Sequence, residues 1–442
     1  MKRVSMVVLA AALAIAALAG LSPRPAASQQ GAPAGKDEAP LPAVADNAPL
    51  EVSLWGGIRD LYKIAVPRPL GADAATAEVQ SIQVNDFKVS SLFEVLDEKS
   101  FIADLAAEGM SIDKDPWVQV GAQGVTKCRV ATVGDKVQLE FKLFEVPRGD
   151  KAVLERTYTG GADDVRSLVH EWVNEVIGYF TGEKGVFGTR LAFARRTSSS
   201  SKQIFTADWS GGGVARVTKN DSINILPAFG PGGSIYYTSF VERAPFLYRT
   251  GQRGAVLAER GLNMGAAFHG DRMAVVLSKD GNPEIYVGNA DGTGLTRLTS
   301  SGAIDVSPSW SPDGSQIAFV SDRHGSPQIF VMGSGGGGAK RITYKGSYNQ
   351  TPSWCPRAGS NLIAFTGRDG GTFDVFTVDA GSGQIRRLTQ KQGRNMDPAF
   401  APDCRAVAFH SSRGGVFVSN PEGLNQNMVI PGDAETIKWS PK

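Results

Sequence analysis

The chain has 442 residues, which is long enough for two or more domains that each bury a hydrophobic core. Its 46 Lys and Arg residues nearly balance 44 Asp and Glu residues, giving a formal net charge of +2. So small a charge argues against a broad electrostatic attraction to nucleic acid or anionic lipid. The 52 glycines favour tight turns and therefore a fold dominated by β-strands.

The N-terminus has the pattern of an export signal. Lys2 and Arg3 precede an apolar run, Met6–Ala19, and a stretch of small residues follows up to Ser28. The run is shorter than the about 20 residues that span a bilayer. We therefore predict that residues 1–28 are a signal peptide and that the mature chain is released into the export compartment.

Residues 29–50 are rich in Ala and Pro and are predicted to form a mobile tail. The three cysteines, Cys128, Cys355 and Cys404, are too few for a disulfide framework. Free buried thiols are the expected state of Cys355 and Cys404, with a bond between these two as the alternative.

A mixed segment over residues 51–184 predicts a small α/β domain. Its β-branched and aromatic runs Lys63–Val66 and Val137–Val146 indicate strands. Apolar residues at helical spacing predict helices over Ala77–Phe93 and Val165–Phe180.

Residues 185–442 contain an internal repeat. An aromatic residue that precedes a turn recurs at intervals of about 40 residues, which is the length of a four-stranded, WD40-like propeller blade. Six units are present, so the sequence predicts a six-bladed β-propeller. Three strands within residues 191–218 lack a preceding aromatic unit, and we expect the strand at 437–441 to complete that blade. The repeated aromatics are Phe229, Phe268, Trp310, Trp354, Phe400 and Trp439.

Catalytic and metal-binding motifs are incomplete. His170 and Glu171 imitate the start of the zinc-protease helix motif, but Asn174 stands where a second His ligand is required. No Gly-x-Ser-x-Gly nucleophile motif occurs. Asp-Gly pairs such as Asp313-Gly314 lack the successive acidic ligands of a calcium loop and are expected to be hairpin turns. We therefore expect no catalytic residue, metal or cofactor.

One polar position recurs five residues before the blade aromatics, with Ala434 as the exception. In a propeller these positions immediately precede the innermost strands, so they would ring one mouth of the central channel. Their side chains could face a partner, or they could bond local backbone and make the turn into each strand. The residues are Asn224, Asn263, Asp305, Asn349 and Asn395.

Residues 180–193, Phe-Thr-Gly-Glu-Lys-Gly-Val-Phe-Gly-Thr-Arg-Leu-Ala-Phe, resemble the junction between the two domains of the TolB family. The Ser-Pro-Asp-Gly repeats, the six units and the preceding α/β domain agree with this resemblance. The resemblance implies a periplasmic, non-catalytic protein of the Tol-Pal system. Such a protein would bind the lipoprotein Pal by a propeller mouth and TolA by its N-terminal segment, supporting outer-membrane integrity and cell division.

The resemblance also implies which residues of this chain correspond to the family's Pal-binding and TolA-binding segments. It implies a monomer that meets the membrane only through partners, among them other Tol or outer-membrane proteins, and that binds no nucleic acid. The alternative is a propeller-type periplasmic hydrolase or carbohydrate-binding protein, which would cluster carboxylates or aromatics in the channel. The implied Pal-binding mouth comprises Asn224, Leu262, Asn263, Gly265, Asp305, Val306, Asn349 and Asn395, and the implied TolA-binding segment comprises Glu51, Val52, Ser53, Leu54 and Trp55.

Overall fold

The computed structural model describes residues 61–71 and 75–442. The predicted signal peptide 1–28, the tail 29–50 and the TolA-binding segment Glu51–Trp55 lie outside these residues. The N-terminal part is a five-stranded sheet in the order β2-β1-β3-β4-β5. β1 pairs in parallel with β2 and β3, and the remaining pairs are antiparallel. The strands are β1 (Tyr62–Ala65), β2 (Phe93–Val95), β3 (Gly124–Val133), β4 (Lys136–Glu145) and β5 (Ala152–Gly160).

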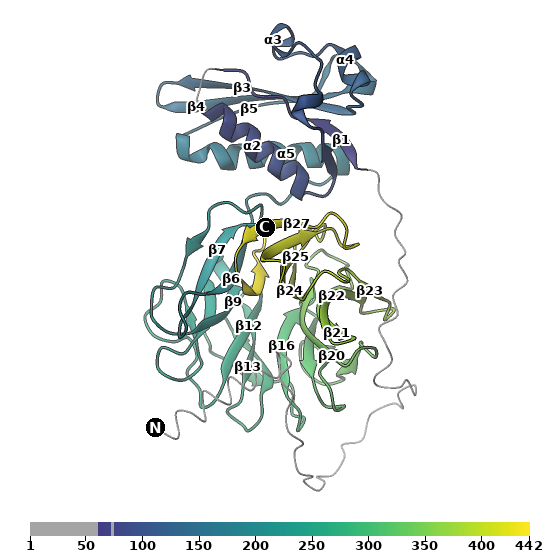
Figure 1. The fold of residues 1–442 in the computed structure, drawn as a ribbon. Helices are drawn as coiled ribbons and strands as arrows, with labels where there is room; N and C mark the ends of the chain where they lie inside the picture. Colours follow the sequence, from purple (N-terminus) through teal and green to yellow (C-terminus); the bar gives the residue numbers. More distant parts are fainter. Residues whose placement is uncertain (1–60, 72–74) are drawn as a thin grey trace.

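Two helices, α2 (Ala75–Val89) and α5 (Val165–Thr181), lie between this sheet and the rest of the molecule (Figure 1). On α5 the indole ring of Trp172 stacks on Phe141 of β4, with ring centroids 5.0 Å apart. α5 ends at Gly182, which has a φ of 79° that glycine adopts without steric cost. The α/β domain is thus built around a sheet with helices packed on its apolar face.

The sequence reasoning was wrong in part about this domain. The first helix ends at Val89 and not at Phe93, because the apolar residues that follow it form β2 and pair with β1. The strands β2, β3 and β5 were missed, as were the short helices α3 (Leu105–Glu108) and α4 (Lys114–Gln119). None of the described helices is long and apolar enough to cross a membrane.

The C-terminal part is a six-bladed β-propeller, as the repeat predicted. The predicted domain boundary between residues 184 and 185 lies in the stretch between α5 and the first propeller strand. The innermost strands are β9 (Asn224–Phe229), β12 (Asn263–His269), β16 (Asp305–Trp310), β20 (Tyr348–Trp354), β24 (Asn395–Phe400) and β28 (Glu435–Trp439). The other strands are β6 (Arg190–Arg196), β7 (Lys202–Asp208), β8 (Ala215–Arg216), β10 (Ile235–Ser239), β11 (Phe246–Arg249), β13 (Arg272–Leu277), β14 (Glu284–Asn289), β15 (Thr296–Arg297), β17 (Gln316–Ser321), β18 (Gln328–Gly333), β19 (Lys340–Arg341), β21 (Leu362–Asp369), β22 (Thr372–Asp379), β23 (Ile385–Arg387), β25 (Val407–Ser411), β26 (Gly415–Ser419) and β27 (Asn427–Pro431).

The ring closes through the C-terminal strand. β28 pairs with β6, so the first blade has the order β28-β6-β7-β8, and this prediction is confirmed. The indole Nε1 of Trp439 donates a hydrogen bond of 2.8 Å to Thr189 Oγ1 beside this junction. The second blade departs from the predicted four strands: it has three, and the fourth position is reduced to one isolated bridge between Leu247 and Leu257.

The outer strands are anchored by a repeated polar cluster. In the fourth blade, Arg341 Nε donates to the carbonyl oxygen of Thr343 over 2.6 Å. The hydroxyl of Thr343 donates to Gln328 Oε1 over 2.8 Å and accepts from the backbone N–H of Ile329. Equivalent clusters form around Thr218, Thr299 and Thr389. In four blades, the Arg-x-Thr repeat therefore holds the outer strand to the neighbouring strand through buried hydrogen bonds.

Cys355 and Cys404 form a disulfide, and the expectation of free thiols was wrong. The two residues lie in the loops that follow β20 and β24, and neighbouring blades bring these loops together with a Cα–Cα distance of 5.6 Å. This separation is typical of a disulfide. Cys128 on β3 is buried and free.

The α/β domain sits over one end of the propeller (Figure 1). Glu183, just after α5, pairs with Arg357 over 2.9 Å and with Arg405 over 3.3 Å. Both arginines lie in loops that follow innermost strands. The opposite end of the channel, where the innermost strands begin, therefore faces away from the α/β domain. We call this free end the channel mouth.

Candidate functional site

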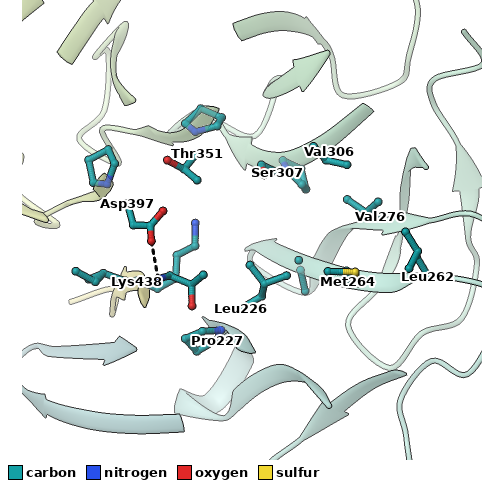
Figure 2. A pocket seen from close by; sticks show the side chains of 17 residues that line it. Leu226, Pro227, Leu262, Met264, Val276, Val306, Ser307, Thr351, Asp397 and Lys438 are labelled. Atoms are coloured by element: carbon teal, nitrogen blue, oxygen red, sulfur yellow. Dashed lines mark hydrogen bonds between the residues drawn. The ribbon is translucent and has the colours of Figure 1, made fainter. Parts of the chain in front are cut away.

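A pocket occupies the central channel near the channel mouth (Figure 2). All six innermost strands contribute to its wall, because each runs along the channel axis. The lining residues are Leu226, Pro227, Leu262, Met264, Gly265, Ala266, Val276, Val306, Ser307, Pro308, Thr351, Pro352, Asp397, Pro398, Thr436, Ile437 and Lys438.

Six equivalent residues in this wall share a left-handed backbone. Each lies three positions before a blade aromatic, and each coincides with a shift in the register of the innermost strand. A register shift of this kind is a β-bulge. It changes the direction in which the following side chains point, relative to the regular alternation of a strand. Positive φ is uncommon for residues other than glycine, so its repetition in every blade marks a constructed feature of the channel. The residues, named here the bulge ring, are Leu226 (φ 54°), Gly265 (65°), Ser307 (56°), Thr351 (50°), Asp397 (55°) and Thr436 (55°).

The pocket has two chemically different sides. Figure 2 shows the side chains of Leu262, Met264 and Val276 on one side, opposite Asp397 and Lys438. The apolar side comes from the second, third and fourth blades, and the polar side from the fifth, sixth and first. The channel is therefore amphipathic across its width.

The two charged groups of the pocket are held inside the channel. Asp397 Oδ2 accepts a hydrogen bond of 2.8 Å from the backbone N–H of Thr436. Burial raises the pKa of the Asp397 carboxyl, which that hydrogen bond partly offsets. Burial also lowers the pKa of the Lys438 ammonium, and the charge of Asp397 opposes this shift. Both ionised forms are thus less favourable here than in water.

The predicted ring of polar residues is at the channel mouth, but its side chains do not face solvent. Asn263 donates to the carbonyl oxygen of Glu259 over 2.8 Å, and Asn349 donates to that of Lys345 over 2.9 Å. The carboxylate of Asp305 pairs with Arg323 over 3.1 Å. Of the two roles considered for this ring, the contacts match the structural one, because the side chains bond nearby loop backbone or neighbouring side chains. Partner binding by these residues stays a prediction. All five residues, Asn224, Asn263, Asp305, Asn349 and Asn395, are fully buried.

The other three residues implied by the resemblance do reach the pocket. Leu262, Gly265 and Val306 are part of its lining. Two exposed apolar side chains beside the channel mouth were missed: Val241 is 49% exposed and Ile304 is 37% exposed. They lie in loops next to the mouth. In the sequence, an apolar residue within a polar loop could have indicated each of them. Together these side chains make one side of the rim partly apolar.

His170 also has a structural explanation. Its Nδ1 atom lies 2.6 Å from Asp86 Oδ2. The side chain of Asn174, which replaces the second zinc ligand, accepts a hydrogen bond from the backbone N–H of Phe187 and donates one to its carbonyl oxygen. Within the described residues, no group of three His, Cys, Asp or Glu side chains could hold a metal ion.

Comparisons with known proteins match both parts of the chain. The family model described as the TolB amino-terminal domain matches residues 50–152. The model described as the TolB beta propeller domain matches residues 178–375. These two matches cover β1 to β4 of the α/β domain and most of the blades.

Relatives and a solved structure agree with these matches. The Tol-Pal system protein TolB of Anaeromyxobacter dehalogenans (strain 2CP-C) is 39% identical over 249 residues, covering 54% of this chain and 57% of the relative. The protein of that description from Desulfosudis oleivorans is 33% identical over 258 residues, covering 54% and 58%. The chain thus spans a little over half the length of these curated relatives.

The crystal structure of TolB from Acinetobacter baumannii extends the likeness to nearly the whole chain. It covers 90% of this chain and 98% of its own, with a TM-score of 0.76 and 25% sequence identity. The two family matches agree with this structural likeness in both domains. The chain therefore belongs to the TolB family.

Proposed function

We propose that this chain is a non-catalytic, periplasmic interaction protein of the Tol-Pal system. In this proposal the channel mouth binds the lipoprotein Pal, and the segment Glu51–Trp55 binds TolA, so that the protein supports outer-membrane integrity and cell division. The observation that carries the proposal is the open, two-sided pocket at the end of the channel that the α/β domain leaves free.

The rim of this pocket has the properties of a docking surface. Val241 and Ile304 are exposed apolar side chains beside a recess that Leu262 and Val306 line. Apolar side chains next to a pocket and surrounded by polar residues are typical of protein–protein interfaces. A protruding loop of a partner could place a side chain in the recess and cover this rim.

The pocket chemistry supports binding over catalysis. Asp397 and Lys438 are the two titratable side chains among its described lining residues. Glycoside hydrolysis ordinarily uses a pair of carboxyl groups, and acyl transfer by a hydroxyl needs a neighbouring base. The lining hydroxyls of Ser307, Thr351 and Thr436 have no histidine beside them in the pocket. These features favour an interaction protein over the propeller-type hydrolase or carbohydrate-binding alternative.

Calorimetric titration of the mature chain with the soluble domain of its Pal lipoprotein tests the first part. Leu262→Asp and Val306→Asp place a carboxylate in the apolar side of the pocket, and we expect each to weaken binding by tenfold or more. Val133→Asp is the matched control, because Val133 is also an exposed valine but lies on the α/β domain. Pal affinity that is unchanged by both pocket variants would contradict this docking face.

Removal of residues 29–57 tests the second part. The proposal expects the shortened chain to lose TolA binding while it keeps its affinity for Pal. Circular dichroism and the thermal unfolding midpoint check that the remaining domains are folded. Loss of binding to both partners by a folded chain would count against two separate binding segments.

A further inference from the structure

Four arginines surround one side of the channel mouth, on the first, fifth and sixth blades. Arg195 lies near the end of β6 at the mouth, and Arg413 lies in the turn between β25 and β26. Arg368 and Arg394 flank the fifth and sixth innermost strands. We call these four residues the arginine crescent. They are far apart in sequence, and the closed ring of blades brings them to one end of the propeller.

Each guanidinium of the crescent lies over an aromatic ring. The Cζ atom of Arg413 is 3.9 Å from the ring centroid of Phe417. Arg368 and Arg394 share Phe373, at 5.8 and 5.5 Å, and Arg195 is 5.1 Å from the centroid of Phe193. Such stacking holds the flat guanidinium group in place.

The crescent has no acidic partner within the described part of the chain. Arg195 donates to the carbonyl oxygens of Pro431 and Asp433, and Arg413 donates to Ser411 Oγ and Gln426 Oε1. Among the described residues, none of the four forms an ion pair with a carboxylate, whereas Arg323 of the fourth blade pairs with Asp305. The crescent therefore carries uncompensated positive charge at the rim.

Acidic groups also lie at the mouth, and one of them, Asp433, is half exposed beside the crescent. Glu435 pairs with Lys202, and the carboxylate of Asp433 contacts His410 over 3.7 Å. On the opposite side of the mouth, Glu259 pairs with Lys279 over 3.4 Å. The apolar residues Val241 and Ile304 belong to that opposite side as well. The mouth is thus divided into a side with exposed apolar side chains, where Arg243 and Arg260 are also exposed, and a side that carries the arginine crescent.

From this division we infer that the arginine crescent recognises an acidic loop of the protein that docks at the channel mouth. This inference rests on the proposed function and adds the chemistry of the partner: carboxylates over the fifth, sixth and first blades, and apolar side chains over the second to fourth. A planar guanidinium suits a carboxylate because it can donate two parallel hydrogen bonds. The adjacent apolar rim favours a protein over a phosphate-bearing lipid surface, since a folded loop offers both kinds of side chain.

The test is a titration of the mature chain with the soluble Pal domain over a range of salt concentrations. Arg368→Gln and Arg394→Gln each remove one charge and keep a polar side chain. We expect each to weaken Pal binding about threefold to tenfold at low salt and to reduce the salt dependence of the affinity. Arg249→Gln is the matched control: Arg249 also stacks on an aromatic ring, Tyr236, but it lies at the other end of the propeller.

The outcomes separate the inference from the proposed function. If the unsubstituted chain binds Pal and both crescent variants bind it equally well, the inference is overturned and the proposed function stands. If the unsubstituted chain does not bind Pal, the proposed function is wrong, and the inference that rests on it is overturned as well. Vesicles of phosphatidylglycerol provide the third arm. Binding to these vesicles that needs the crescent, together with unchanged Pal affinity, would assign the arginines to lipid and overturn the inference.

Discussion

The Nδ1 atom of His170 on α5 lies 2.6 Å from Oδ2 of Asp86 on α2, at the surface where the α/β domain meets the propeller. On its other side, Nε2 of the same ring is 4.0 Å from Oδ2 of Asp208 on β7. The ring also stacks on Phe187 with a centroid distance of 5.4 Å. A buried imidazole is therefore placed between one carboxylate from each domain.

This arrangement predicts that the stability of the protein falls at alkaline pH. Burial alone would lower the pKa of His170, but Asp208 and Asp86 outweigh it and raise the pKa from 6.5 to about 9. Arg166 on α5 and Arg190 on β6 also face Asp208 and oppose part of this effect. Because the folded pKa is the higher one, the contribution is complete below pH 6.5 and is lost as the pH rises through about 9. Its size is on the order of 3 kcal/mol.

Urea unfolding midpoints measured from pH 6.5 to 9.5 check this expectation, with His170→Gln as the comparison. The variant leaves Asp86 buried without its cationic partner, which costs about 3–5 kcal/mol at pH 6.5. Its midpoint should also change less with pH than that of the unsubstituted chain. His324→Gln, on a propeller loop, is the control. Equal pH dependence in the chain with and without His170 would show that this histidine is not the titrating group.

The Cys355–Cys404 disulfide is predicted to stabilise the propeller. It joins residues 49 positions apart, and a loop of that length corresponds to about 4 kcal/mol of lost unfolded-chain entropy. Replacing both cysteines by serine should therefore lower the thermal unfolding midpoint by several degrees. Arg357 and Arg405, which pair with Glu183, follow these cysteines closely, so the junction with the α/β domain should loosen too.

Counting thiols checks the pairing directly. Alkylation of the denatured chain without reductant should modify Cys128 alone, and all three cysteines should react after reduction. In the native state Cys128 should resist alkylation, since it is buried and burial raises the pKa of its thiol. Modification of three cysteines without reductant would show that the disulfide is absent.

The propeller could be predicted from sequence because its signal repeats. The aromatic residues from Phe229 to Trp439 recur at blade spacing, and the unmatched strands at both ends of that region predicted the closure between β28 and β6. The α/β domain gave a weaker signal, because β2 and β5 have no repeat and little alternation. The strand at Phe93 was read as helix for this reason.

The repeat predicted where the polar ring lies in the blades, but not how its side chains are oriented. The position of Asn349 at the start of a blade follows from the repeat, whereas its bond to the carbonyl oxygen of Lys345 depends on the shape of one loop. A positive φ at Thr351 goes against the preference of a β-branched residue, so no local pattern indicates the bulge ring. Arg195 and Arg394 lie at the same end of the propeller only because the ring of blades closes, and their distance in sequence gives no sign of this.

Thr343→Val tests the polar cluster of the outer strands. Valine has nearly the shape of threonine, but it removes the hydroxyl that donates to Gln328 and accepts from Ile329. Both partners are buried and would be left without this bond, so we expect a loss of about 1–3 kcal/mol in the free energy of unfolding. Thr293→Val is the control, because Thr293 makes its bonds within an exposed turn. Urea denaturation that gives equal losses for both variants would mean that the cluster adds nothing beyond a surface turn.

Two glycine substitutions of opposite expected sign test the bulge ring. Gly265 has a φ of 65°, and an added Cβ would meet nothing closer than Leu226 Cδ1 at 3.9 Å. Gly265→Ala therefore costs backbone strain without a clash, and we expect it to destabilise the protein by about 1–2 kcal/mol. At Gly335 no positive φ is found and no atom lies within 4 Å of an added Cβ. Gly335→Ala should leave stability unchanged or raise it by up to about 1 kcal/mol, because alanine restricts the unfolded chain. Thermal and urea unfolding of both variants give the comparison, and a Gly265→Ala protein as stable as the Gly335→Ala protein would show that the left-handed turn in β12 is not required for the channel wall.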